Sequence, residues 1–304
     1  MEENYAEIFE ELVQGTQDYI LGNGLRAMVL GISGGIDSTV VAALCHEVSK
    51  RTNIPLIGRS LPTKYNKESE ISAANLVGKA FCNDFEEVPI KNPYESFLSL
   101  LDRAECGMTP IANGNIQARL RMIYLYHLAS IKGGLVMDTD NLTENNLGYF
   151  TIHGDVGDFN PIGGLWKTEV FKLAEWISKT YWKENIEWLQ EEDFDKNDPR
   201  NDKGSQAIAI VKSLALKPTA GLGITDNDLE EIGAESYEQV DAILKDILSW
   251  KCREDMFAWK EREHPLEDYL KEHKVKDISY DIIERVATRH FRSEFKRKHL
   301  PIKL

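Results

Sequence analysis

The stretch Ser33-Gly34-Gly35-Ile36-Asp37-Ser38 decides the fold of this chain. It follows an apolar run at residues 27–32, which predicts a short buried strand, and it leads into an apolar segment at 39–44, typical of a helix start. The adjacent glycines permit backbone torsions closed to other residues and let the main chain approach a ligand closely. We therefore expect a strand, a tight glycine turn and a helix, in that order.

The turn carries the residue types of a phosphate-binding loop. Unpaired amides at the helix start and the hydroxyls of Ser33, Ser38 and Thr39 would supply donors for phosphate oxygens. Asp37 would repel phosphates unless a cation lay between them, so a divalent metal, foremost magnesium, is implied. The alternative is an ordinary turn in which Ser33 or Asp37 caps the helix. The position after a buried strand favours the phosphate loop, which is not of the Walker A type because no Gly-Lys-Ser/Thr ends it.

Composition and charge exclude several classes of protein. The 304 residues carry a formal net charge of −14, which argues against a general nucleic-acid surface, the basic tail at 292–303 being the exception. The acidic start does not resemble a signal peptide and no apolar run is long enough to cross a membrane, so we expect a cytoplasmic protein. The cysteines form neither a CxxC pair nor a metal-ligand pattern, which indicates reduced thiols: Cys45, Cys82, Cys106 and Cys252.

Strand and helix patterns alternate along the first half of the chain. This alternation predicts an α/β fold, a doubly wound parallel sheet flanked by helices, followed by a helical C-terminal part. The expected strands are 27–32, 54–58, 85–90 and 135–137, and the expected helices are 7–20, 69–81, 93–101, 115–131 and 167–181. We expect one domain over 1–304, with the acidic polar stretch 183–204 as a surface loop. Ligands should bind at the carboxyl ends of the strands, where 33–38 and 138–144 both emerge.

The glycine loop resembles the SGGxDS loop of the ATP pyrophosphatases, which split ATP between its α and β phosphates and adenylate a substrate. Four further segments make the chain similar to one branch of that family, the ammonia-dependent NAD synthetases. In sequence order they are 114–122 (GNIQARLRM), 139–144 (TDNLTE), 148–161 (with GYFT at its start, GD at 154–155 and NP at its end) and 217–220 (KPTA). Together they span most of the chain, and the resemblance implies the adenine nucleotide alpha hydrolase-like fold.

The resemblance also implies a reaction. Deamido-NAD (nicotinate adenine dinucleotide) would be amidated with ammonia at the expense of ATP through an acyl-adenylate, giving NAD, AMP and pyrophosphate. Two anions must then be brought together, so charge neutralisation is the central problem. Similar proteins are homodimers with the dinucleotide at the subunit interface. The apolar residues of the 115–131 helix (Met122, Tyr124, Leu125 and Leu128) could supply that contact or pack in the core.

Carried over residue by residue, the resemblance assigns an ATP site. Asp37 and Glu144 would hold Mg²⁺, and Lys167 would contact ATP and stabilise the leaving pyrophosphate. Helix caps or exposed helix-start residues are the alternatives for Glu144, Lys167, Thr139 and Thr219. The full set of ATP-binding residues is Gly31, Ile32, Ser33, Gly34, Gly35, Ile36, Asp37, Ser38, Thr139, Lys167 and Thr219.

The same resemblance assigns residues to the dinucleotide and to ammonia. Arg119, Asp158 and Lys296 would contact deamido-NAD, whereas Arg121 must face elsewhere on its helix than Arg119. Asp155 is the candidate catalytic carboxylate that takes a proton from ammonium. An equally plausible role for Asp155 is to fix the glycine-rich turn around it.

The chain departs from the family pattern on the dinucleotide side. Ile152 stands where a lysine is common, Asp138 replaces a frequent glycine, and the following turn at 153–158 is shorter than the common form. Phe295 replaces the histidine of a segment that touches the substrate. Adenylation of a carboxylate is therefore better supported by the sequence than the identity of that carboxylate.

Two other functions compete with this one. The first is another ATP-pyrophosphatase amidotransferase or ligase, similar to GMP synthetase, and the second is a nucleotide-binding regulator without turnover. About two dozen residues precede the first strand, too few for an amidase domain, so we expect free ammonia or a separate glutaminase to supply the nitrogen.

Overall fold

A parallel sheet organises the fold, with strands in the order β3-β2-β1-β4-β5-β6. The computed structural model describes residues 4–103, 109–188, 203–218, 227–252, 262–299 and 302–303. The strands are β1 (Met28–Gly31), β2 (Leu56–Ser60), β3 (Asp84–Glu87), β4 (Leu135–Met137), β5 (Phe159–Asn160) and β6 (Ile302–Lys303). The order reverses between β1 and β4, as in a doubly wound sheet, which confirms the predicted fold class.

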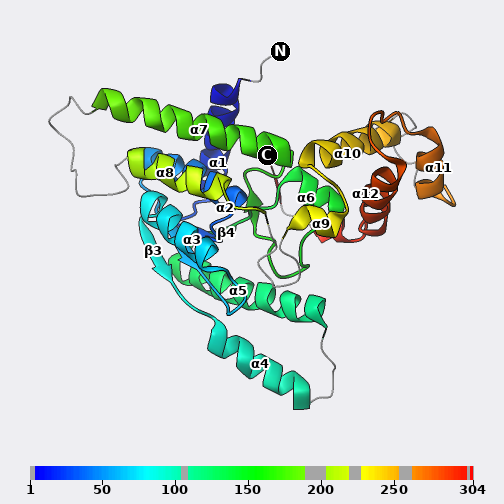
Figure 1. Cartoon of the computed structure of the whole chain (residues 1–304). Helices are drawn as coiled ribbons and strands as arrows, with labels where there is room; N and C mark the ends of the chain where they lie inside the picture. The colour runs from blue at the N-terminus through cyan, green and yellow to red at the C-terminus, as the bar shows by residue number, and fades with distance from the viewer. Residues whose placement is uncertain are drawn as a thin grey trace.

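Helices cover both faces of the sheet. In sequence order they are α1 (Tyr5–Gly22), α2 (Ile36–Thr52), α3 (Glu68–Phe81), α4 (Lys91–Arg103), α5 (Pro110–Lys132), α6 (Leu142–Leu147), α7 (Lys167–Trp188) and α8 (Lys203–Leu214). Figure 1 shows α1, α2, α7 and α8 on one side and α5 with α4 on the other. Residues alternate along β1 accordingly, because Met28 and Leu30 pack against α2 and α7 whereas Val29 packs against Leu125 of α5.

The C-terminal part is helical, as expected. It comprises α9 (Asp228–Ile232), α10 (Tyr237–Cys252), α11 (Pro265–Glu272) and α12 (Tyr280–Arg292), followed by a 3₁₀ turn at Lys296–His299. These helices share a core of their own, which also takes in Leu147 of α6 and Trp166 just before α7. Within the described ranges no helix is both long and apolar enough to span a membrane.

Several boundaries differ from the prediction. Helix α5 begins at Pro110, capped by the Thr109 hydroxyl that accepts from the Ala112 amide at 3.1 Å, so Gly114 lies inside the helix. Strand β3 ends at Glu87, earlier than the predicted 90. The predicted surface loop at 183–204 is wrong at both ends, because α7 continues to Trp188 and α8 begins at Lys203. Residues 189–202 lie outside the described residues, and the single domain over 1–304 stays a prediction.

The apolar face suggested for subunit contact proves to be mostly core. Leu125 is buried in the cluster on the α5 face of the sheet, with Tyr124 and Leu128 packed against it. Other apolar residues on α5 are the exposed ones, namely Ile111, Ile123 and Ile131.

Candidate active site

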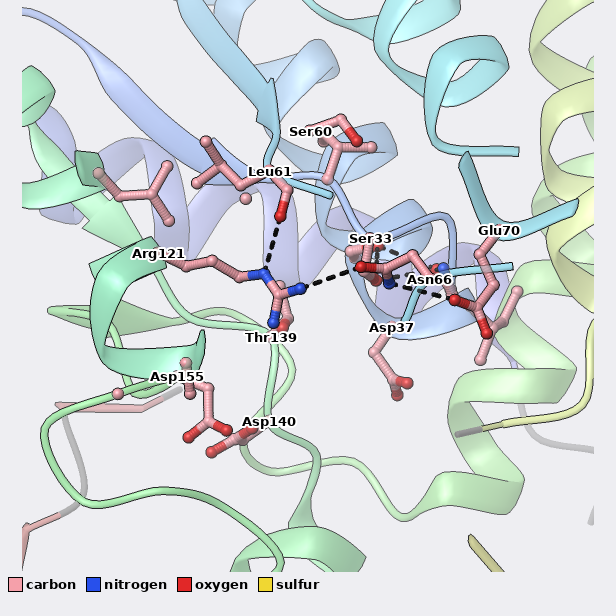
Figure 2. Close-up of a pocket in the computed structure, with 18 of the residues that line it drawn as sticks. Ser33, Asp37, Ser60, Leu61, Asn66, Glu70, Arg121, Thr139, Asp140 and Asp155 are labelled. Carbon is pink, nitrogen blue, oxygen red and sulfur yellow. Dashed lines mark hydrogen bonds between the residues drawn. The ribbon is translucent and has the colours of Figure 1, made fainter. Parts of the chain in front are cut away.

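A cavity of about 290 Å³ opens at the carboxyl ends of β1, β2 and β4, where ligands were expected. The glycine loop forms one wall, and the segment from Thr139 to Glu144 after β4 forms another. Further walls come from the residues after β2, from α5 and from the loop that carries Asp155. Figure 2 shows Arg121, Thr139, Asp140 and Asp155 on one side of the cavity and Ser33 and Asp37 on the other.

The glycine loop has the predicted form of strand, turn and helix start. Gly34 has φ +85°, and a Cβ there would lie 2.5 Å from the Glu70 carbonyl oxygen and 2.8 Å from the Ala74 amide nitrogen. Only glycine fits, because α3 packs its backbone directly on the loop. The Ser38 hydroxyl donates to the Gly35 carbonyl at 3.0 Å, and the hydroxyls of Ser33 and Ser38 are 3.0 Å apart. The loop is therefore held in shape by its own hydroxyls.

Asp37 and Glu144, distant in sequence, meet around one ammonium group. Lys167 Nζ donates to Asp37 Oδ2 at 2.5 Å and to Glu144 Oε1 at 3.0 Å. Asn141 links the same acids, because its side-chain Nδ2 donates to Asp37 Oδ1 at 2.9 Å and its backbone amide donates to Glu144 Oε2 at 3.2 Å. The predicted pair of acids is thus brought together across the cavity from α2 and α6. Lys167 is buried at the start of α7, so the alternative of an exposed helix-start lysine is wrong.

Burial dominates the electrostatics of this cluster. It raises the pKa of Glu144 to about 7, although Lys167 works in the opposite direction. Burial alone would lower the pKa of Lys167, but the Asp37 and Glu144 carboxylates raise it well above its usual value. Lys167 therefore carries its charge at neutral pH, and the two acids form a site that already holds a cation.

Two aspartates, Asp140 and Asp155, line another part of the cavity, and Asp138 lies next to Asp140, whose amide donates to Asp138 Oδ1 at 2.8 Å. Burial raises the pKa of Asp138 to about 7 and that of Asp140 well above its usual value. The surroundings of Asp155 raise its pKa to about 6, chiefly by desolvation. Asp155 also accepts from the Thr151 amide at 2.6 Å, which supports the turn-fixing role as well. One carboxylate oxygen each of Asp138 and Asp140 is buried without a hydrogen-bond partner among the described residues.

The residues predicted to contact the dinucleotide lie outside the cavity lining. Arg119 is exposed, with Nη2 donating to the Ile152 carbonyl at 3.4 Å. Asp158 accepts from the Tyr126 hydroxyl at 3.0 Å and from the Val136 amide at 2.9 Å. Lys296 Nζ donates to the carbonyls of Gly148 and Phe150 at 2.7 and 2.6 Å. Their predicted roles stay predictions. Thr139 does line the cavity, whereas Thr219 lies outside the described residues.

Sequence reasoning missed Arg121 as a cavity residue. Arg121 was expected only to face elsewhere on its helix than Arg119, and its guanidinium faces the cavity (Figure 2). The signal was available in the helical phase, because Ala118, Arg121 and Leu125 share one face of α5 and all line the cavity.

A second missed group reaches the cavity from the C-terminal part. The Tyr149 hydroxyl lies 2.8 Å from both Asp228 Oδ1 and Glu231 Oε2, and Tyr149 and Asp228 line the cavity. Arg289 completes the group by donating to Glu231 Oε1 at 3.0 Å and covering the Tyr149 ring. Tyr149 belongs to the segment 148–161 that carries the family resemblance, but no short motif marks Asp228, Glu231 or Arg289, because α9 and α12 bring them to Tyr149 only in three dimensions.

A parallel sheet with an SGGxDS loop at its switch point defines a nucleotide-binding protein of the ATP pyrophosphatase class. The family model described as NAD synthase matches residues 8–300, so the chain belongs to the NAD synthase family. It is 33% identical over 235 residues to an NH(3)-dependent NAD(+) synthetase of Methanococcoides burtonii, covering 77% of this chain and 76% of that protein.

Two other relatives match most of their own length. An NH(3)-dependent NAD(+) synthetase of Finegoldia magna is 31% identical over 242 residues, which are 79% of this chain and 85% of that protein. Among solved structures, the NMN synthetase of Francisella tularensis superposes with a TM-score of 0.70 at 26% identity, covering 97% of each chain.

Proposed function

We propose that this chain catalyses the ATP-dependent amidation of deamido-NAD with ammonia, giving NAD, AMP and pyrophosphate. The convergence of the SGGxDS loop, Asp37, Glu144 and Lys167 on one cavity carries the proposal. Family membership and the NH(3)-dependent relatives that match over most of their length support it. Neither similarity to GMP synthetase nor a regulator without turnover is favoured by these relatives.

The residues around Lys167 fit a magnesium ion bound together with ATP. Asp37 and Glu144 offer carboxylate oxygens, the ligands that Mg²⁺ prefers, and magnesium commonly takes only one or two carboxylates plus phosphate oxygens. Both acids already share one cation, the Lys167 ammonium, which shows that the site concentrates negative charge. When bound, Mg²⁺ would neutralise phosphate oxygens.

Adenylation brings a carboxylate and a triphosphate together, so the protein must offset the repulsion between their negative charges. An oxygen of the nicotinate carboxylate attacks the α-phosphorus, and the bond from that phosphorus to the pyrophosphate oxygen breaks. The hydroxyls of Ser33 and Ser38 and the helix start of α2 lie where phosphate oxygens would bind. Lys167, charged at neutral pH, would stabilise the departing pyrophosphate.

Amide formation needs a neutral amine. Ammonium must give up a proton, after which its nitrogen attacks the acyl carbon, AMP leaves and the nitrogen loses a further proton. Asp155 lines the cavity and has a pKa of about 6, so it is mostly ionised at neutral pH and can accept a proton from ammonium.

The test is an assay for NAD formed from deamido-NAD, ATP, Mg²⁺ and ammonium chloride. We expect NAD, AMP and pyrophosphate in equal amounts, and D37N should abolish them, whereas D18N on the exposed face of α1 should not. Release of ADP and phosphate, or efficient use of glutamine by the purified chain, would contradict the proposal.

Nicotinate mononucleotide is the second acceptor to test, because the NMN synthetase of Francisella tularensis matches this chain end to end. The departure at Ile152, which removes a cation from the dinucleotide side, favours this smaller acceptor. The ratio of kcat/KM for the two acceptors decides between them.

A homodimer is part of the proposal. The exposed side chains of Ile123 and Ile131 on α5, together with Leu100 on α4, present apolar surface that a second copy could cover. Light scattering should give twice the monomer mass, and I123E should lower it. A monomer at micromolar concentration would exclude the dimer. The cytoplasmic location stays a prediction.

A further inference from the structure

Arg121 is a cavity-facing cation without an anionic partner. Its Nε donates to the Leu61 carbonyl at 3.0 Å and its Nη2 donates to Asn66 Oδ1 at 3.2 Å, both neutral acceptors. Within the described part of the chain no carboxylate forms an ion pair with it, and Nη1 has no hydrogen bond. Desolvation lowers its pKa to about 10, so it is fully charged at neutral pH.

Two other buried cations that line the cavity, Lys167 and Arg59, are already paired with carboxylates. Lys167 is shared by two carboxylates, whereas the charges of Asp155 and Glu70 act on Arg121 without an ion pair. A partly desolvated guanidinium held by neutral groups is costly to fold and gains most from an incoming anion. The arrangement therefore points to a ligand rather than to a structural ion pair.

The guanidinium is held in place before any ligand arrives. Asn66 accepts from the Thr63 amide at 2.9 Å through the same oxygen that binds Arg121. The Asn66 amide group donates to Glu70 Oε2 at 3.2 Å, which ties the arginine to the start of α3. A fixed planar fork suits phosphate oxygens better than a mobile charge does.

The position of Arg121 in the cavity indicates which phosphate of the nucleotide it would bind. Figure 2 shows the guanidinium between Leu61, just after β2, and Thr139, just after β4, while Asp37 lies farther along beside Ser33. Asp37, Glu144 and Lys167 occupy the side expected for the metal and the leaving pyrophosphate. This leaves for Arg121 the phosphate that is attached to the nucleoside. That phosphate is retained from ATP through the adenylate to AMP.

We propose that Arg121 binds a non-bridging oxygen of the α-phosphate, so that it holds the reacting phosphorus in ATP, in the acyl-adenylate and in AMP. Asn66 acts as the residue that positions it. This inference rests on the proposed function only in taking an adenine nucleotide as ligand, and it is independent of which carboxylate is amidated.

The experiment measures binding by calorimetry with adenosine, AMP and pyrophosphate as probes. In R121Q we expect AMP to bind about 10- to 100-fold more weakly, the loss of a charge-assisted hydrogen bond, with adenosine and pyrophosphate within twofold of wild type. R121K keeps the charge without the fork and should lose less AMP affinity. K132Q removes one exposed charge from the same helix and is the matched control.

Three results would overturn the inference. The first is an unchanged affinity of R121Q for AMP. The second is an affinity for adenosine that falls as much as the affinity for AMP, because that result would mean that Arg121 only shapes the cavity wall at Leu61. A selective loss of pyrophosphate affinity would assign the wrong phosphate. If R121Q does not fold, N66A decides, because displacing the fork should weaken AMP at least threefold and leave adenosine unchanged. Failure of wild type to make NAD would refute the proposed function but not this result.

Discussion

The Lys167 ammonium lies 2.5 Å from the Asp37 carboxylate and 3.0 Å from that of Glu144, and the three side chains come from three different helices. Two carboxylates this close would repel each other without a cation between them. Lys167 therefore joins α7 to α2 and α6, and it holds the acids where a metal and nucleotide would bind.

Replacing Lys167 by methionine should destabilise the fold by about 3–5 kcal/mol, because it leaves two buried acids without their partner. The loss should be smaller at pH 5.5 than at pH 8. Lys167 lowers the pKa of Glu144 toward its value of about 7, so removing it raises that pKa further. A raised carboxyl pKa favours folding below its unfolded value and loses that contribution as pH rises through the folded value.

Denaturant unfolding of K167M at the two pH values checks this, with K167M/E144Q as the partner variant. The double variant has one buried acid fewer, so its loss should be less than the sum of the single losses. Equal losses at both pH values would show that the cluster contributes nothing through charge.

The glycine loop gives a second prediction. G34A should lower the free energy of unfolding by about 1–2 kcal/mol for the left-handed backbone alone, with a further loss from contact with Glu70 and Ala74. G35A is the control for stability, because φ there is −71° and the nearest atom, Ser33 Oγ, would be 3.3 Å from the new Cβ. Equal melting temperatures for the two variants would contradict the packing of α3 on Gly34.

The glycine loop also shows how much of the fold and of the candidate site could be predicted from the sequence. Its form follows from the residues themselves, since strand, glycine pair and helix start are local patterns, and the alternation of strands and helices around it predicts a doubly wound parallel sheet. Arg121 faces elsewhere than Arg119, as expected, but its place in the cavity was not predicted, because that place follows from the buried face of α5 and not from Arg119. The Tyr149–Asp228 contact joins segments 79 positions apart, and no local pattern encodes such a pairing.

His290 provides a prediction on pH. It is buried, its Nε2 lies 2.8 Å from Lys251 Nζ, and its Nδ1 lies 2.9 Å from the Asn146 carbonyl. A ring that donates to the carbonyl and accepts from the lysine must be neutral. Burial, together with the charges of Lys251 and Arg297, holds the pKa of His290 well below its usual value.

The unfolded chain gains a proton at His290 below about pH 6.5 that the folded chain does not take up, so stability is lost as pH falls. The contribution approaches about 1.4 kcal/mol per pH unit. In H290Q the unfolding free energy should fall less between pH 7 and pH 5.5 than in wild type. H264Q, at an exposed histidine, should keep the wild-type slope, and a wild-type slope in H290Q would refute the assignment.

The last prediction concerns Tyr149, whose single hydroxyl proton lies between Asp228 and Glu231 at 2.8 Å from each. One hydroxyl proton can be donated to only one of the two carboxylates at a time, and burial raises the pKa of Asp228 above its usual value. Glu231 also forms an ion pair with Arg289, at 3.0 Å. Removing the hydroxyl in Y149F deprives Asp228 of a partner that lowers its pKa, and stability should fall by about 1–3 kcal/mol, the cost of a buried acceptor left unpaired.

The loss in Y149F should grow as pH rises from 5.5 to 8, because the protonated form of Asp228 survives the change better than the ionised form. Y149F/D228N should recover part of it, since an amide has no charge to bury. Y126F is the matched control, because Tyr126 donates to Asp158 at an exposed site and its loss should cost less than about 1 kcal/mol. Should Y149F and Y126F unfold alike at both pH values, the hydroxyl of Tyr149 would have no special place between the two acids, and the link from the cavity to α9 would rest on packing alone.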